Sequence, residues 1–353
     1  MTFTFPKKQN GRVVAVDFFC GAGGLTRGLL NAKINVLAGI DVEESLRKTY
    51  QKNNEPSKFI RRDIRKLKIH ALRRYLKIKD IDTVIYAACT PCQPFSTLNQ
   101  MRGEDDRKDL LLAFAAIVEQ APPDVILIEN VPGLNTKYGR EIYEKFLAAI
   151  DRAGFPIENI TSDFLDANNY DVPQTRKRFI LLASRHGRLK LPDAITPKPT
   201  VETYLKKYPK LAHGEKSDKY HNHEARRLQP HLLRIVRAVP KNGGSRRDVK
   251  DASILLKCHR DKPTVHKDVF GRMRWDCPAP TLTARCTDVY CGRFTHPDQD
   301  RGISIREAAA LQTFPDSYIF YGNSILQLAR QIGNSVPVNF AKALGEKLVD
   351  QIK

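Results

Sequence analysis

Residues 13–25 read VVAVDFFCGAGGL, an apolar run that ends in a cluster of glycines. The run, Val13–Phe19, is typical of a buried strand, and a helical pattern through Leu29 and Leu30 follows the glycines. Glycines between a strand and a helix let the backbone approach a ligand closely and point the helix amides at it. The stretch therefore predicts a strand, a tight turn and a helix that together form a ligand-binding unit.

Four further apolar runs of the same kind precede residue 185, with amphipathic stretches between them: Val36–Ile40, Thr83–Ala88, Val125–Ile128 and Phe179–Ala183. Short apolar runs separated by helical patterns indicate strands that are buried on both faces of a parallel sheet. We therefore predict an α/β fold with a doubly wound, mostly parallel sheet. Two helices are expected nearer the C-terminus, over Arg306–Gln312 and Phe340–Ile352.

Composition limits the class of protein. The chain has 353 residues, of which 41% are hydrophobic, and a formal net charge of +20. That length suggests roughly two domains with a sizeable core. Seven Cys with irregular spacing argue for reduced thiols and against a disulfide framework. No run of about 18 apolar residues spans a bilayer and the first ten residues lack a secretory signal, so we expect a cytoplasmic protein without membrane contact.

The positive charge is concentrated in one segment. Residues 200–275 hold 19 Lys and Arg against 8 Asp and Glu, and six of the nine His. Such an excess favours a polyanionic partner, nucleic acid above all. Its Lys and His residues between 206 and 231 are expected to form a solvated, phosphate-facing surface. The predicted division is a catalytic and cofactor-binding domain over 1–190, a smaller basic domain over 191–304, and a segment over 305–353 that returns to the first.

An acidic residue, Asp41, stands 20 residues after Gly21, at the end of the second apolar run. Its carboxylate could accept hydrogen bonds from both hydroxyls of a ribose. Thr26 occupies the place of the third glycine in Gly-x-Gly-x-x-Gly, which favours a nucleoside over a pyrophosphate. The alternative is a tight turn with Asp41 as a helix cap. The pair Asp63-Ile64 could reach an adenine ring.

Cys92 lies in the segment Cys89-Thr90-Pro91-Cys92-Gln93-Pro94, which follows the third apolar run. Three interpretations remain open: a buried structural cysteine, half of a C-x-x-C redox pair, or a nucleophilic thiolate at the carboxyl end of a strand. A redox pair normally opens a helix, and Pro94 favours an irregular loop instead. An ordinary thiol is only about 3% ionised at neutral pH, so a nucleophile here needs a positive neighbour.

Two further groups are candidates for polar chemistry. Glu129 ends the fourth apolar run, at the same predicted sheet edge as Cys92, and could act as a general acid. Gln174, Arg176 and Arg178 alternate on an extended segment, so their side chains should face one way and could clamp an anion or a carbonyl. The alternatives are a helix cap or a surface ion pair for Glu129, and a solvated strand start for the arginines.

Taken in order, these motifs resemble those of the cytosine-5 DNA methyltransferases of bacteria and phages, over nearly the whole chain except the basic segment. Residues 17–24 resemble the family's cofactor turn, Pro91-Cys92-Gln93 its nucleophile motif, and residues 129–131 its acidic motif. Gln174-x-Arg176-x-Arg178 resembles the paired-arginine motif, and residues 280–285 and 333–337 resemble the last two motifs. The resemblance implies an S-adenosylmethionine site built from these residues: Phe19, Gly21, Gly23, Gly24, Asp41, Asp63, Ile64, Asn334 and Val336.

The resemblance implies a Rossmann-like methyltransferase domain and a basic target-recognition domain. It implies methyl transfer to C5 of a flipped-out cytosine in a specific double-stranded DNA sequence, through a covalent Cys92 adduct at C6. Glu129 would act at N3 and the 4-amino group, and Arg178 with Arg176 at O2. We expect a monomer that associates with the nucleoid. A cognate restriction endonuclease would act on the same site without direct binding.

Three alternatives stay open at this point. The same chemistry could act on tRNA, because the tRNA cytosine-5 methyltransferases share most of these motifs. The chain could also be an inert homologue that only binds DNA, although it retains the whole candidate catalytic set. A zinc module is the third alternative, disfavoured because its candidate ligands are not paired in the sequence: Cys258, His259, Cys277, Cys286 and Cys291.

Overall fold

The computed structural model of the chain describes residues 5–6, 11–91, 109–136, 139–261 and 264–352. The chain forms two compact units, and each is described by itself. The first comprises Met1–Ala167, Lys177–Ala194 and Val336–Lys353, and the second comprises Asn168–Arg176 and Ile195–Ser335.

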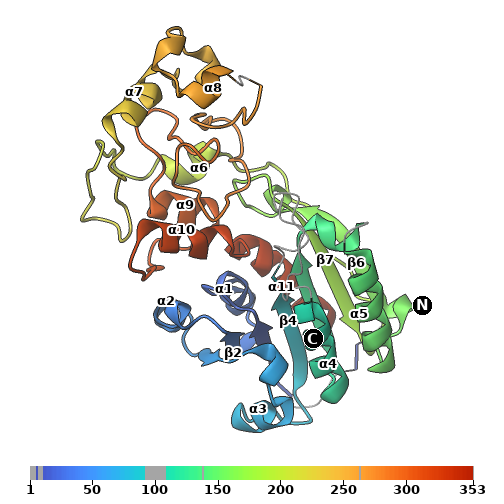
Figure 1. Cartoon of the computed structure of the whole chain (residues 1–353). Coiled ribbons are helices and arrows are strands. Elements are labelled where there is room, and N and C mark those ends of the chain that lie inside the picture. Colours follow the sequence, from blue (N-terminus) through green and yellow to red (C-terminus); the bar gives the residue numbers. More distant parts are fainter. Residues whose placement is uncertain (1–4, 7–10, 92–108, 137–138, 262–263, 353) are drawn as a thin grey trace. The chain divides into compact units, whose positions relative to one another are not determined.

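A seven-stranded sheet forms the centre of the first unit (Figure 1). Its order is β3-β2-β1-β4-β5-β7-β6. The first five strands of that order are parallel, and β7 runs antiparallel to both β5 and β6. The strands are β1 (Val13–Phe18), β2 (Asn35–Asp41), β3 (Lys58–Arg61), β4 (Thr83–Cys89), β5 (Val125–Asn130), β6 (Ile160–Asp166) and β7 (Lys177–Ser184). The predicted doubly wound, mostly parallel sheet is confirmed.

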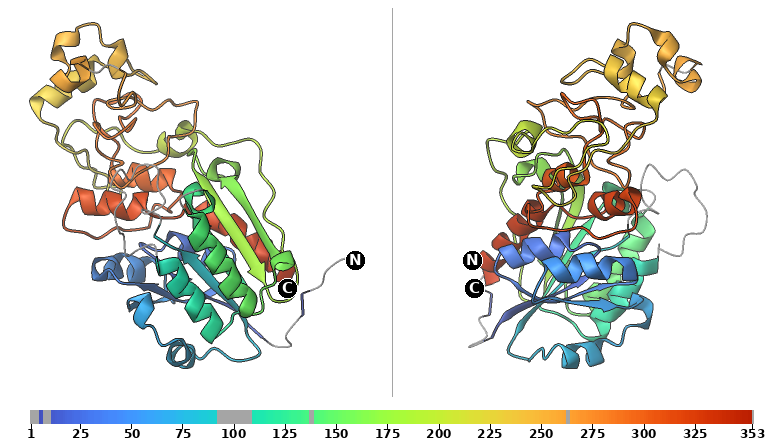
Figure 2. Two further views of the ribbon diagram at one scale, coloured as in Figure 1. Left: turned by 45° about the vertical axis from the view of Figure 1, so that its right-hand side comes forward. Right: turned by 90° about the vertical axis from the view of Figure 1, so that its left-hand side faces the viewer.

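Helices cover both faces of this sheet (Figure 2). One face packs against α3 (Ile69–Tyr75), α4 (Leu110–Gln120) and α5 (Arg140–Arg152), and their apolar residues share one core with the strands. On the other side α1 (Gly24–Asn31) packs against α11 (Val338–Ile352), while α2 (Arg47–Asn53) contacts β3. Because both faces are covered, β5 is buried along its whole length, which explains its continuous apolar sequence.

The apolar runs of the sequence correspond to β1, β2, β4, β5 and β7, and each predicted boundary lies within two residues of the observed one. Two strands were not predicted. In β3 only Phe59 is buried, and in β6 only Ile160 is. Neither strand lies in the middle of the sheet, so neither needs the continuous apolar run on which the prediction relied. The predicted C-terminal helices correspond to α9 (Ile305–Leu311) and α11.

The second unit has short helices joined by long irregular segments. The helices are α6 (Val201–Leu205), α7 (Pro230–Ala238), α8 (Lys257–Asp261), α9 and α10 (Ile325–Gly333). A small apolar cluster around Val236 and Phe270 forms part of its interior. The unit's limits differ from the predicted basic domain, since residues 168–176 and 305–335 also belong to it.

Buried arginines satisfy the backbone of these irregular segments. Arg272 is fully buried and donates to the carbonyls of Val236, Val239, His296 and Gln299. Carbonyl groups in loops, and those in the last turn of a helix such as that of Val236 in α7, have no partner within a helix or sheet and need another when they are buried. A guanidinium supplies five donors in a fixed plane, which suits it to join several loops at one point.

Candidate active site

The glycine turn joins β1 to α1 in a left-handed backbone conformation. Phe19, Gly21 and Gly23 have φ of 61°, 54° and 91°, and the last is the N-cap of α1. A Cβ added at Gly21 would meet no heavy atom within 4 Å, so this backbone borders open space. No side chain caps the amino end of α1. The turn therefore borders open space at Gly21, beside the uncapped amino end of α1, and its binding of a ligand stays a prediction.

Asp41 lies against this turn from the end of β2. Its Oδ2 accepts the Gly21 N–H at 3.0 Å and its Oδ1 accepts the Glu43 N–H at 3.0 Å. Burial raises the pKa of Asp41. Each carboxylate oxygen keeps a further lone pair, so Asp41 can still accept from ribose hydroxyls. Asp41 also binds the backbone of the turn at Glu43, but the N-cap of the short 3-10 helix that follows is Glu43 and not Asp41.

An exposed apolar side chain follows Asp41. Val42 is 62% exposed, although it directly succeeds a buried strand. Val42 is not among the predicted site residues, because an isolated Val in a loop carries no signal of its own. Exposed beside a candidate ribose acceptor, it is suited to contact a flat apolar ring.

Asp63 and Ile64 follow β3, whose register pairs Arg61 with Asp41. The Asp63 carboxylate accepts the Arg65 N–H at 3.0 Å and forms an ion pair with the Arg65 guanidinium at 2.8 Å. The hydrogen bond from the Arg65 side chain lowers the pKa of Asp63. Ile64 is buried in the core of the first unit. The predicted adenine contacts of this pair stay a prediction.

A buried hydrogen-bond chain lies beneath the turn and was missed by the sequence analysis. The Thr26 hydroxyl donates to Asp17 Oδ2 at 2.6 Å and lies 2.9 Å from the Tyr50 hydroxyl, which in turn lies 2.7 Å from Ser57 Oγ. Asp17 is fully buried, and burial raises its pKa to about 7. Thr26 thus stands in place of a third glycine because its hydroxyl binds the carboxyl group at the end of β1.

Glu129 and Arg178 meet near the carboxyl end of β5. Glu129 is 3% exposed, and its Oε1 lies 3.0 Å from Arg178 Nε. Its other oxygen, Oε2, accepts a hydrogen bond from Cys89 Sγ at 2.8 Å. Paired strands bring the three together, because Cys89 ends β4 opposite Glu129. Among the described residues, the buried carboxyl group of Glu129 therefore binds a guanidinium through one oxygen and a thiol through the other.

The residue after Glu129 anchors the start of the candidate nucleophile loop. Asn130 Nδ2 donates to Thr90 Oγ1 at 2.6 Å, and both side chains are buried. Asn130 Oδ1 also accepts the N–H of Val131. These bonds fix the chain two residues before Cys92. Cys92 itself, and the charged loop 102–108, lie outside the described residues.

Arg176 and Arg178 do not share one partner, although they alternate in sequence. Arg176 is 3% exposed and donates to three carbonyls, those of Leu282, Gly333 and Ser335, at 2.9–3.2 Å. It also bonds Gln174, whose side-chain oxygen accepts the Leu282 N–H. All these partners lie in the second unit. Arg176 therefore joins the motifs near residues 282 and 333, whereas Arg178 pairs with Glu129.

The last predicted cofactor residues lie at the end of α10 and just after it. Asn334 is exposed and belongs to the second unit, whereas Val336 is buried and belongs to the first. A Cβ at Gly333 would lie 2.1 Å from the Thr283 carbonyl oxygen, so this position requires glycine. After Val336 the chain enters α11, which packs on α1 and so returns to the helix of the glycine turn.

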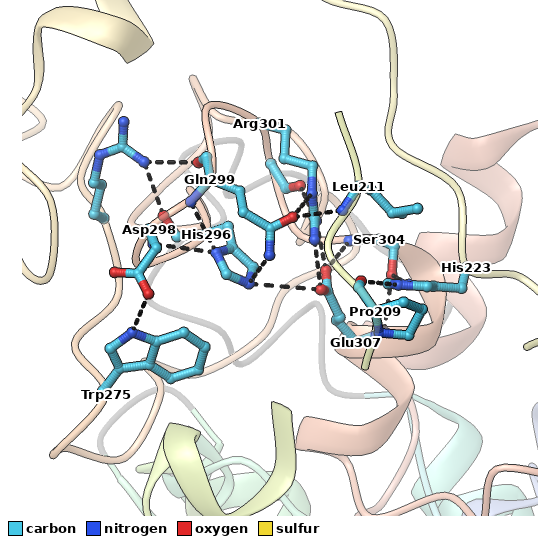
Figure 3. A network of polar contacts seen from close by, with 12 residues as sticks. Pro209, Leu211, His223, Trp275, His296, Asp298, Gln299, Arg301, Ser304 and Glu307 are labelled. Carbon is cyan, nitrogen blue, oxygen red and sulfur yellow. Dashed lines mark hydrogen bonds and ion pairs between the residues drawn. The ribbon is translucent and has the colours of Figure 1, made fainter. Parts of the chain in front are cut away.

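A buried polar network occupies the second unit (Figure 3). Arg301 binds both oxygens of Glu307 at 2.7 Å, and His296 lies 3.7 Å from the same carboxylate. His223 is 1% exposed and bonds Ser304 Oγ at 2.9 Å. The expectation of a solvated surface over residues 206–231 is therefore wrong for His223, because its ring is held inside by Ser304.

The described residues contain neither a cluster of metal ligands nor a helix that could cross a membrane. Among residues 11–91, 109–136, 139–261 and 264–352, no group of three or more His, Cys, Asp or Glu is arranged to hold a metal ion. Within the same ranges, no helix has both the length and the apolar character needed to cross a membrane.

The chain is similar to known proteins over almost its whole length. The family model for C-5 cytosine-specific DNA methylases matches residues 13–350. The Type II methylase M.HgiDII of Herpetosiphon aurantiacus is 35% identical, over 96% of this chain and 94% of the relative. The Type II methyltransferase M1.HphI of Haemophilus parahaemolyticus is 29% identical, over 95% and 86%.

Solved structures share the fold. A prophage-encoded DNA modification methyltransferase of E. coli superposes with a TM-score of 0.70 and 21% identity, over 96% of this chain and 99% of that one. The Entamoeba histolytica methyltransferase EhMeth gives 0.66 and 17%, over 98% and 100%. With the family model matched over almost its whole length, the chain belongs to the C-5 cytosine-specific DNA methylases, which transfer a methyl group from S-adenosylmethionine to C5 of cytosine in DNA.

Proposed function

We propose that this enzyme methylates one cytosine within a specific double-stranded DNA sequence, and that Glu129 and Arg178 hold the flipped-out base while Cys92 attacks it. The observation that carries this proposal is the buried Glu129 carboxyl group, bound by Arg178 at 3.0 Å at the carboxyl edge of the sheet. Open α/β sheets bind their ligands at this edge. Because C5 and C6 are inaccessible in a duplex, the base must leave the stack to reach it.

The chain's own residues carry the steps on the ring. Attack by the Cys92 thiolate on C6 forms a C–S bond and displaces the electrons of the C5–C6 double bond toward N3, so that negative charge develops on the ring. A proton delivered by Glu129 to N3 neutralises the charge, while Arg178 donates to O2, leaving an enamine with a nucleophilic C5. The chemistry that S-adenosylmethionine supplies when bound is an electrophilic methyl group on a sulfonium. Once C5 has gained the methyl group, N3 returns its proton to Glu129. Removal of the C5 proton by a base then re-forms the C5–C6 double bond as the Cys92 sulfur leaves C6.

The cofactor site is proposed on the glycine turn. The open space beside Gly21 fits a ligand that approaches the backbone of Gly21, Gly23 and Gly24 closely, and Asp41 has acceptor capacity for the ribose. Phe19 and Val42 would contact the adenine ring, with Asp63 and Ile64 at its edge. Asn334 and Val336 would close the site from the C-terminal motif.

The second unit is proposed as the target-recognition domain. It contains residues 200–275, with 19 basic against 8 acidic residues. Most of this charge would contact phosphates and give a salt-sensitive affinity, while a few side chains choose the sequence. Arg176 would hold this unit's segments in order rather than contact the base. The Type II names of the relatives support a cognate restriction endonuclease that acts on the same site. We propose that the enzyme acts as a monomer in the cytoplasm, at the nucleoid that holds its DNA substrate.

Methylation of DNA from cells that express the protein tests the proposal. Bisulfite sequencing should show one methylated cytosine context, and purified enzyme should methylate the corresponding duplex but not tRNA. Cys92→Ala should lose at least about a thousandfold in turnover while binding the duplex normally. Cys258→Ala, which changes an exposed cysteine of α8, is the matched control. Turnover by Cys92→Ala, or a preference for tRNA, would contradict the proposal.

A duplex with 5-fluorocytosine at the target isolates the covalent step. Fluorine at C5 blocks the final elimination, so wild-type enzyme should remain attached to the DNA through denaturing electrophoresis. The Cys92→Ala variant should form no such adduct, whereas Cys258→Ala should form it as the wild type does. An absent adduct under turnover conditions would exclude attack by Cys92.

A further inference from the structure

The thiol of Cys89 is part of the candidate active site, three residues before the predicted nucleophile. Its Sγ lies 2.8 Å from Glu129 Oε2, while Arg178 Nε lies 3.0 Å from Oε1. Each oxygen of this carboxyl group, which is 3% exposed, thus has its own donor. The proposed roles of Cys92 as nucleophile and of Glu129 and Arg178 in holding the base give Cys89 no function.

Strand register makes this contact a built feature of the sheet. Cys89 on β4 pairs with Glu129 on β5, and Glu129 pairs with Ile180 on β7. Paired residues on neighbouring strands point to the same face, and Arg178 lies two residues from Ile180 on that face. The three side chains therefore converge from three adjacent strands. Contacts made between strands are less mobile than contacts made from loops.

The chemistry of the carboxyl group gives the contact a use. Glu129 must present one oxygen toward N3 and accept from the 4-amino group, which requires a fixed rotation of the carboxyl plane. Arg178 alone fixes one oxygen and leaves the plane free to turn. A second donor on Oε2 removes that freedom. In this contact the Cys89 thiol is the hydrogen-bond donor and the Glu129 oxygen the acceptor.

We infer that Cys89 is a positioning residue for methyl transfer, which holds the Glu129 carboxyl group in the orientation that acts on the cytosine ring. This inference rests on the proposed role of Glu129. It assigns to the first cysteine of Cys89-Thr90-Pro91-Cys92 a function separate from redox pairing. Pre-orientation of a reacting group lowers the barrier of the chemical step and leaves substrate binding unchanged.

Two pairs of variants test the donor without changing side-chain shape. Ser and Ala differ at position 89 only by a hydroxyl donor, and Thr and Val have nearly the same shape but differ in that donor. We expect kcat to fall about tenfold for Cys89→Ala and Cys89→Val, and to stay within about threefold of wild type for Cys89→Ser and Cys89→Thr. KM for DNA and the thermal midpoint should be equal within each pair. The second pair serves if Cys89→Ala does not fold.

Exchange of the C5 hydrogen of cytosine, measured without cofactor, isolates the addition step in which Glu129 acts. Cys89→Ala should slow this exchange as it slows kcat, and should have no further effect in a Glu129→Gln background. Equal kcat values within both pairs would overturn the inference. If all four variants lose activity equally and their thermal midpoints fall, Cys89 has only a structural role and the inference is likewise wrong. If Glu129→Gln retains full activity, the proposed function itself fails. If Glu129→Gln is inactive and Cys89→Ala is not, only the role of Cys89 is wrong.

Discussion

Arg176 and Arg178 are two arginines separated by one residue on an extended segment, but their side chains have different partners. Arg178 is paired with the buried Glu129, whereas Arg176 binds the carbonyls of Leu282, Gly333 and Ser335. Sequence spacing could place both on one face, because alternation is a local property of an extended chain. It could not separate their partners, which are up to 159 residues away along the chain. The partner of each side chain therefore decides its role.

Lysine at each position separates these two roles. Arg176→Lys keeps a positive charge but cannot reach several carbonyls at once, so it should destabilise the second unit by about 3 kcal/mol. Arg178→Lys should lower kcat about a hundredfold with little change in thermal midpoint, since it removes the planar donor from Glu129. Thermal melts and single-turnover methylation measure the two effects. A stable but inactive Arg176→Lys protein would assign Arg176 to catalysis after all.

At the scale of elements, the glycine turn depends on the packing of α1 against α11. A Cβ added at Gly28 would lie 2.3 Å from the Ala341 Cβ and 2.6 Å from the Val338 carbonyl oxygen. The last helix of the chain thus lies directly on the helix that begins at the turn. This close approach explains how a C-terminal segment can affect a site formed near the N-terminus.

Gly28→Ala should therefore weaken the protein and its cofactor site together. A methyl group within 2.3 Å of Ala341 Cβ forces the helices apart, at a cost of about 2 kcal/mol. We expect a lower thermal midpoint and an S-adenosylmethionine affinity reduced about fivefold, measured by calorimetry on folded protein. Glu346→Ala, on an exposed position of α11, is the control and should change neither. An unchanged midpoint for Gly28→Ala would show that the helices can separate freely.

Element prediction succeeded where burial leaves a sequence signature. Central strands such as β4 and β5 are covered on both faces, so their apolar runs identify them, and in β5 the run also marks the polar residues Glu129 and Asn130 at its end. The exposed strand β6 leaves no such run, and the partners of Glu129 depend on which strands are neighbours. The contact of Cys89 with Glu129 requires the register of β4 on β5, which no local pattern encodes. In the sequence, Thr26 is only a departure from the Gly-x-Gly-x-x-Gly motif. The structure shows that its hydroxyl group donates to Asp17.

At the scale of the whole molecule, the two units respond oppositely to acid. Asp17 lies in the first unit, and burial raises its pKa to about 7. Its folded form therefore binds a proton that the unfolded form lacks between about pH 4 and 7, so the first unit gains stability as pH falls. His296 lies in the second unit, and burial lowers its pKa to about 4. There the unfolded form binds the extra proton, so stability is lost as pH falls below about 6.5.

The Glu307 ion pair acts in the same direction as His296, at lower pH. Burial would raise the pKa of Glu307, but Arg301 outweighs this and lowers it to about 2. Its contribution is present above about pH 4.5 and is lost as the pH falls toward 2. Protonation of His296 also breaks specific bonds, because its Nδ1 accepts the N–H groups of Asp298 and Gln299 at 3.1 Å. The second unit is thus the acid-sensitive one.

The single Trp of the sequence makes this difference measurable. Trp275 bonds Asp298 at 2.7 Å, and its ring lies 5.3 Å from that of His296, so its fluorescence reports the second unit. From pH 7.5 to 5 the second unit should lose about 2 kcal/mol, and its fluorescence melt should fall by about 5 °C. The circular dichroism of the sheet should not fall with it, because Asp17 stabilises the first unit by a similar amount. His296→Gln, which keeps an acceptor but does not titrate, should abolish the fluorescence shift. Identical shifts of both signals in the wild type would mean that the units unfold as one, and that the charge state of His296 does not control the second.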